Sequence, residues 1–244
     1  MVAVATGVVA TSPLVLVRSA PSGCSAVDAE GGLGLQVEGL GLGAPFVVPL
    51  ATVVGLTFRW LAVPVLSSRL IATGIGTPPD EPALQVYFLA GALPGLDVEN
   101  PRQVSAWRYP RQYGPRSPLF SRGTILTLNG ARQFLISGTA SVIGHQTHHE
   151  NQVADQLRES LRNVRSLLDE GHRLMGDARA QLDGDGILKV YIRDPADYER
   201  IRATLQAEAP ADIPRIYLQG DICRENLLTE IDGIVGCAPV ADST

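Results

Sequence analysis

A carboxylate interrupts an apolar run near the end of the chain. Residues 217–236 read YLQGDICRENLLTEIDGIVG, with Glu230 between hydrophobic neighbours. Alternation along a strand favours a solvent-facing position for Glu230. If a pocket holds it instead, desolvation raises its pKa and makes the acid form available near neutral pH as a proton donor. Cys223 precedes it by seven residues. Taken alone, this cysteine is typical of a small, buried and inert core residue.

Arginines and aromatic residues gather in the segment 99–122, which reads ENPRQVSAWRYPRQYGPRSPLFSR. Its four prolines prevent a helix or a regular strand ladder from running through it, so we expect an ordered loop. Guanidinium groups bind carboxylates in a bidentate manner, and aromatic faces can sandwich a small ring. The loop is therefore either a binding site for an aromatic-like dicarboxylate or a surface loop with solvated arginines. The residues in question are Arg108, Arg111, Arg116, Arg122, Trp107, Tyr109 and Tyr113.

Cofactor motifs are missing from the sequence. The stretch GHQTHHE contains His145, His148 and His149, but these lack the helical i, i+4 spacing of a zincin helix. We therefore interpret the stretch as the connection between a strand and a helix. No GxGxxG motif follows a strand and no GxxxxGK motif occurs, so nucleotide binding has no support. We expect no metal and no other cofactor.

The composition is that of an ordinary globular protein. The 244 residues include 45% hydrophobic and 18% charged residues, with a formal net charge of −5 and no basic patch for a nucleic acid. Three widely separated cysteines, Cys24, Cys223 and Cys237, indicate neither a disulfide framework nor a zinc site, and a reducing cytoplasm is the expected location. Residues 39–58 are uncharged, but two prolines and four glycines fit short strands better than a membrane helix.

The order of elements is clearest after residue 123. Two strands around an Asn-Gly turn form a predicted hairpin over 123–144. A long amphipathic helix follows, with one apolar face made by Val153, Leu157, Leu161, Val164 and Leu168. A strand at 187–195, a shorter helix at 196–208 and strands at 215–223 and 227–236 complete a β-β-α-β-α-β-β order. This predicts an α+β fold with both helices on one face of a mixed sheet.

The first part of the chain has a different character. Residues 1–80 are rich in Gly, Val and Leu and predict strands joined by tight turns, and residues 83–91 give a further strong strand signal. The turn sequence TPPDEP at 77–82 predicts a domain boundary. We therefore expect two domains, a strand-rich one at 1–80 and a catalytic one at 81–240.

Four ordered blocks resemble the chorismatase family of the Rid-type (YjgF-like) superfamily. These are residues 99–122, FLISGTASVIGH, LKVYIRDPAD and YLQGDICRENLLTEIDG, and the resemblance spans roughly residues 70 to 236. It implies the Rid-type element order described above. It also implies that Glu230 is the acid that protonates the enolpyruvyl side chain of chorismate. The substrate carboxylates would be held by Arg116, Arg122 and Arg224, with Tyr113 beside the ring.

The resemblance also bears on the product. Family members that form 3-hydroxybenzoate share a glycine at Gly138 and a cysteine at Cys223, where the hydrolytic type tends to carry alanine. The hypothesis is thus a chorismatase-like lyase of secondary metabolism that forms 3-hydroxybenzoate and pyruvate. We expect a cytoplasmic homo-oligomer, with a trimer favoured, that has no nucleic-acid or membrane partner.

The strand-rich residues 1–69 lack the helices of a second Rid-like domain, which implies a chorismatase shortened in its N-terminal half. Two alternatives stay open. One is a homologue that acts on a different small cyclic carboxylic acid. The other is a catalytically silent Rid-type protein that binds a metabolite or a partner.

Overall fold

The structure is a computed structural model. It describes residues 2–6, 15–17, 26–27, 33–37, 46–50, 70–76, 85–90 and 95–239, except 115–116 and 129. The predicted boundary at 77–82 lies outside the described residues, as do Arg116 and Cys24. The division into domains at residue 80 therefore stays a prediction.

A mixed sheet forms the main body of the described chain. Its strands lie in the order β16-β15-β18-β11-β10-β8, and β14 pairs with the end of β18. Strands β15 and β16 are parallel, and the other pairs are antiparallel. The bounds are β8 Leu96–Val98, β10 Gly123–Leu128, β11 Ala131–Ala140, β14 Ala178–Ala180, β15 Ile187–Ile192, β16 Arg215–Gln219 and β18 Thr229–Pro239.

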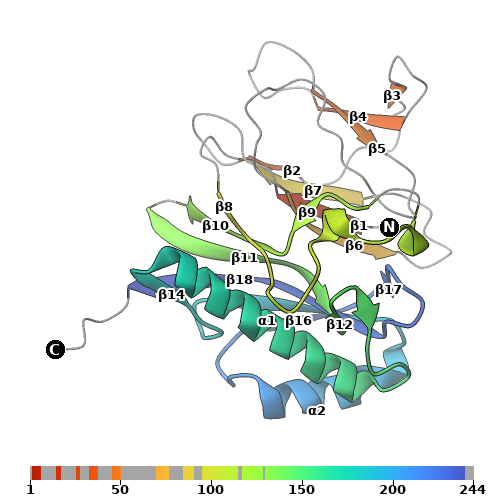
Figure 1. Ribbon diagram of the computed structural model, residues 1–244, viewed down its shortest axis with the longest axis vertical. Coiled ribbons are helices and arrows are strands. Elements are labelled where there is room, and N and C mark those ends of the chain that lie inside the picture. Colours follow the sequence, from red (N-terminus) through yellow and green to blue (C-terminus); the bar gives the residue numbers. More distant parts are fainter. Residues whose placement is uncertain are drawn as a thin grey trace.

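Two helices cover one face of this sheet, α1 (Val153–Met175) and α2 (Tyr198–Glu208) (Figure 1). The five apolar residues expected on the long helix are all buried, because they pack on Phe134 and its neighbours in the sheet. Gly171 lets α1 approach closely, since a Cβ there would lie 2.2 Å from Cε2 of Phe134. The main elements follow the predicted β-β-α-β-α-β-β order, so the expected α+β fold is confirmed.

A second sheet lies on the other side of the first (Figure 1). It contains β1 Val2–Thr6, β2 Val15–Val17, β6 Leu70–Gly76, β7 Gln85–Ala90, β9 Phe120–Ser121 and β17 Asp221–Ile222. Strand β6 packs against β11 of the first sheet. Both β9 and β17 pair with β6, so the segments just before Arg122 and Cys223 are tied to this second sheet.

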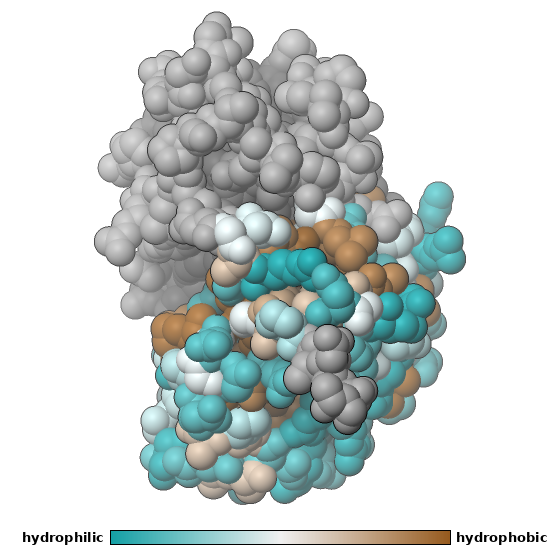
Figure 2. All heavy atoms as spheres, turned by 90° about the vertical axis from the view of Figure 1, so that its left-hand side faces the viewer, coloured by the Kyte–Doolittle hydropathy of each residue, from teal (hydrophilic) through white to brown (hydrophobic). Residues whose placement is uncertain are grey.

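The remaining elements are short. Strands β3 Ala26–Val27, β4 Leu33–Val37 and β5 Phe46–Leu50 form a small sheet, and β12 Val142–Ile143 pairs with β13 Gln146–Thr147. The proline-interrupted loop contains only the single turns η1 Ala106–Arg108 and η2 Arg111–Tyr113, as its sequence predicts, and η3 is Pro195–Asp197. None of the helices in the described part of the chain is long and apolar enough to cross a membrane. The face drawn in Figure 2 is largely hydrophilic over its lower part.

Candidate active site

Glu230 lies inside the protein. It occupies β18, between Ala140 of β11 and Tyr191 of β15, and only 5% of the residue is exposed. As alternation predicts, the Glu230 side chain lies on the face of the sheet away from the helices. The prediction that it faces solvent is wrong. That side of the sheet is covered at this point, because β6 packs across β11 and brings the buried Thr73 over Gly138.

Gly138 makes the space that Glu230 fills. The register between β11 and β18 shifts between Ile136 and Thr139, and Gly138 stands at this irregularity. A Cβ atom on Gly138 would lie 1.9 Å from Oε1 of Glu230 and 3.1 Å from Cγ2 of Thr73. The Glu230 carboxyl group can therefore occupy its present position only because residue 138 has no side chain.

Burial makes Glu230 a weak acid. Desolvation raises its pKa to about 8, and the Asp232 carboxylate adds to this, while the charges of Arg122 and Arg224 act in the opposite direction. A carboxylic acid with this pKa is largely protonated at neutral pH, which is the form that a general acid requires.

Arg122 is the first of two arginines near Glu230. It is 5% exposed, and its Nη2 donates hydrogen bonds to Oη of Tyr109 (2.6 Å) and to the carbonyl of Val104 (3.0 Å). The guanidinium lies over the rings of Tyr109 and Phe120, 5.4 and 5.1 Å from their centroids. Its buried Nε has no hydrogen-bond partner among the described residues. This leaves a buried N–H donor available to an anionic ligand.

Arg224 is the second arginine, and it comes from the turn after β17. Its guanidinium lies 4.0 Å from the ring centroid of Tyr113, and Nη1 donates to the carbonyl of His145 (2.9 Å) and to Oγ1 of Thr147 (3.2 Å). Nδ1 of His145 lies 3.2 Å from Oη of Tyr113. Arg224 therefore joins three segments that are far apart in the sequence.

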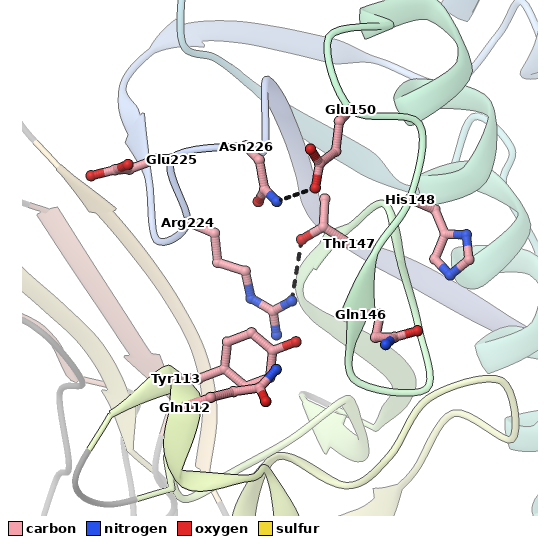
Figure 3. Close-up of a pocket in the computed structure, with 9 residues that line it drawn as sticks. All are labelled: Gln112, Tyr113, Gln146, Thr147, His148, Glu150, Arg224, Glu225 and Asn226. Atoms are coloured by element: carbon pink, nitrogen blue, oxygen red, sulfur yellow. Dashed lines mark hydrogen bonds between the residues drawn. The ribbon is translucent and has the colours of Figure 1, made fainter.

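A pocket of about 650 Å³ opens beside Arg224. Figure 3 shows Arg224 between Thr147 and Tyr113, and the hydrogen bond from Asn226 to Glu150 on the neighbouring wall. The size suits a small molecule, and the lining is mainly polar. Its residues are Gln112, Tyr113, Gln146, Thr147, His148, Glu150, Arg224, Glu225 and Asn226.

Cys223 is not the buried core residue that its type alone suggests, because it lies on a turn and is exposed. Protein atoms nevertheless crowd the thiol. Desolvation and then the Glu230 carboxylate raise its pKa to about 12, against the effect of Arg224 and Arg122. The thiol is therefore exposed but protonated at neutral pH.

Asp232 is a neighbour of Glu230 that the sequence reasoning missed. It lies two residues further along β18, on the same face, and is 3% exposed. Its Oδ2 accepts hydrogen bonds from Nζ of Lys189 and Oη of Tyr191, both at 2.9 Å, and the negative charge raises the pKa of Tyr191 further after desolvation. The signal was present, because an alternating Glu-x-Asp pattern places both carboxylates on one face.

Contacts and charge effects connect most of the predicted site residues, but only Tyr113 and Arg224 among them line the pocket. Gly138 touches Glu230, and the electrostatic influence of Arg122 and Arg224 reaches both Glu230 and Cys223. Tyr113 joins the group through Arg224. The remaining predicted site residue, Arg116, lies outside the described residues. Among the described residues, no group of His, Cys, Asp and Glu side chains is arranged to hold a metal ion.

Fold and site together define an α+β unit with a buried acid under the influence of two arginines. No protein-family profile matches the chain. It is 38% identical over 174 residues to a 3-hydroxybenzoate synthase of Streptomyces hygroscopicus, covering 67% of this chain and 50% of that protein. A chorismatase of Streptomyces rapamycinicus is 36% identical over 170 residues, again covering 67% and 50%.

A crystal structure of a chorismatase has the same fold, with a TM-score of 0.56 and 36% identity over 61% of this chain and 46% of that one. The chain is therefore a relative of the chorismatases in sequence and in fold. It spans about half the length of the curated relatives that it matches.

Proposed function

We propose that the protein is a chorismatase-like lyase that converts chorismate to 3-hydroxybenzoate and pyruvate without a cofactor. The contact between Gly138 and Glu230 is the observation that carries the proposal. The resemblance associates this glycine with formation of 3-hydroxybenzoate. It lies against a buried carboxyl group whose pKa of about 8 suits proton donation. The similarity to a 3-hydroxybenzoate synthase supports the product, and the similarity to a chorismatase supports the substrate.

The first chemical step would be protonation of the substrate. Glu230, in its acid form, gives its proton to the methylene carbon of the enolpyruvyl group, which becomes the methyl group of pyruvate. The adjacent oxocarbenium carbon is then stabilised by the newly formed Glu230 carboxylate. This ion is close to Arg122 and Arg224, whose charges lower the pKa of Glu230 and so favour its ionised form.

The second requirement is loss of a ring proton. Pyruvate leaves with the ether oxygen when the bond from that oxygen to ring carbon 3 breaks, and the hydroxyl oxygen of the neighbouring carbon 4 forms a new bond to carbon 3 as its bond to carbon 4 breaks. Carbon 3 then gives off its hydrogen as a proton, the ring aromatises, and the Glu230 carboxylate takes up this proton. The acid is thereby restored. The two products together contain every atom of chorismate, so this route consumes no water. Glu230 therefore needs no proton exchange with solvent during the cycle, which agrees with its burial.

The two arginines are suited to bind the two carboxylates of chorismate. Arg122 offers its unpartnered Nε, and Arg224 borders the pocket with Tyr113 beneath its guanidinium. Hydrogen bonds from a charged guanidinium to a carboxylate fix orientation as well as charge. We assign the same binding role to Arg116 and a product-determining role to Cys223.

The test is direct. Purified protein is incubated with chorismate, 3-hydroxybenzoate is measured by chromatography, and pyruvate is measured with lactate dehydrogenase. We expect both products in equal amounts. Absence of turnover would contradict the activity, and formation of a dihydroxylated diene acid in place of 3-hydroxybenzoate would contradict the product.

We further propose a cytoplasmic homo-oligomer, with a trimer favoured. Three large apolar side chains support the assembly, Ile216 and Leu218 of β16 and Ile234 of β18, which are 43%, 38% and 37% exposed on the sheet face away from the helices. Exposed apolar surface of this kind is typical of contacts between subunits. Light scattering coupled to gel filtration measures the mass, and a monomer would contradict the assembly.

A further inference from the structure

The turn that carries Cys223 and Arg224 has little regular structure of its own. It runs from the end of β17 at Ile222 to the start of β18 at Thr229. One internal backbone hydrogen bond supports it, from the amide of Leu227 to the carbonyl of Arg224 at 3.0 Å. Backbone carbonyl groups outside a sheet need other hydrogen-bond partners. The groups that bind the carbonyls of this turn therefore determine its path.

A single guanidinium binds three of these carbonyls. Arg193 follows β15, and its Nε donates to the carbonyl of Leu227 at 2.7 Å. Its Nη2 donates to the carbonyls of Ile222 and Arg224, at 2.7 and 2.8 Å, and its Nη1 forms an ion pair with Asp221. The rigid fork of an arginine makes all of these contacts at once, which a lysine ammonium cannot do.

The far end of the turn is held from the other side. Gln156 of α1 is fully buried, its Nε2 donates to the carbonyl of Asn226 at 2.7 Å, and its Oε1 accepts from the amide of Leu228 at 2.7 Å. The turn is therefore fixed between β15 and α1. The freedom that remains to Arg224 is that of its own side chain.

We propose that Arg193 is a positioning residue that holds the backbone of Arg224 where its guanidinium meets Tyr113 and the substrate. The proposal rests on the proposed function. Glu230 is held differently, because its strand pairs with neighbours on both sides. Loss of Arg193 should therefore weaken substrate binding through Arg224 while the proton donor stays in place.

The experiment compares R193A and R193K with R202A, a matched control. Arg202 lies on α2 and pairs only with nearby side chains of the same helix. We expect both Arg193 variants to raise KM for chorismate by about tenfold to a hundredfold, the worth of hydrogen bonds to a charged group. Their kcat should change less than threefold, and R202A should behave as wild type.

A double variant tests the route of the effect. If Arg193 acts through Arg224, then R193A/R224A binds chorismate no more weakly than R224A alone. Additive losses would overturn the proposal, as would an unchanged KM in a folded R193A or R193K variant. Unfolding of both Arg193 variants would also overturn it, because Arg193 would then support the whole sheet.

Amide hydrogen exchange separates this proposal from the proposed function. In the absence of any substrate, the amide hydrogens of residues 221–228 should exchange faster in R193K than in wild type or R202A. The amide hydrogens of β15 and β18 should keep their protection. If the wild type does not act on chorismate, faster exchange confined to the turn still supports the role of Arg193. Unchanged exchange in the turn contradicts it.

Discussion

Replacing Gly138 by alanine tests the geometry on which the active site depends. The added Cβ would lie 1.9 Å from Oε1 of Glu230, whereas ordinary van der Waals contact begins near 3.4 Å. The carboxyl oxygen must therefore retreat by about 1.5 Å, which is 3.4 minus 1.9. Displacement of a reacting group by roughly 1 Å can cost about a hundredfold in rate, or about 2.7 kcal/mol of barrier.

The variant should remain folded. Overpacking a core position costs about 1–3 kcal/mol, which for a domain of this size lowers Tm by roughly 2 to 12 °C. We expect G138A to lose about a hundredfold in kcat for 3-hydroxybenzoate, with a smaller share of that product in the mixture. The assay is chromatography of the products beside a coupled pyruvate measurement, with Tm determined on the same samples.

Gly74 provides a matched control. It lies on β6 next to Thr73, and a Cβ there would meet no atom within 4 Å. G74A should therefore keep the rate and the product of the wild type. If G138A retained both the wild-type rate and the wild-type product, the reasoning that links Gly138 to Glu230 would be refuted.

Other perturbations address the charges around Glu230. Activity should fall as the pH rises through about 8, because the raised pKa of Glu230 marks the loss of the proton-donating form, and a flat rate from pH 6 to 10 would contradict this. D232N removes a neighbouring negative charge and should move that limb of the pH–rate profile to lower pH, whereas an unchanged limb would exclude coupling between the two carboxyl groups. Because the pKa of Glu230 is higher in the folded than in the unfolded state, its contribution to stability is complete below about pH 4.5 and is lost as the pH rises through about 8. E230Q should therefore raise Tm relative to wild type at pH 9 but not at pH 4, and equal effects at both values would contradict the burial of the charge. R224A should raise KM for chorismate more than it lowers kcat, and an effect confined to kcat would argue against a role in carboxylate binding.

Local sequence pattern was sufficient for the main elements after residue 123, but the strand predicted at 215–223 is divided between β16 and β17 in two different sheets, and β14 was missed. The spacing from Val153 to Leu168 defined the buried face of α1, and period-two runs located β11, β15 and β18. These signals reflect burial on one face of one element, so they need no knowledge of the partner. The same reasoning misjudged Glu230, because β6, which packs across β11, is distant from β18 in the sequence.

The supporting residues of the site were beyond local pattern for the same reason. Gln156 contacts Leu228 across 72 residues, and Arg193 contacts Leu227 across 34. Neither side chain has an unusual neighbourhood in the sequence, since one lies on an amphipathic helix and the other at the end of a strand. Grouping Glu230, Gly138 and the arginines required the family resemblance, because no short motif joins them.

The most direct measurement is the rate of pyruvate formation from chorismate by wild type and by E230Q at pH 7. Glutamine keeps the shape of Glu230 but cannot give up a proton as an acid. We expect the wild type to release pyruvate and 3-hydroxybenzoate in equal amounts, and folded E230Q to be slower by about a hundredfold to ten thousandfold. Equal rates for the two proteins would contradict the assignment of Glu230 as the proton donor.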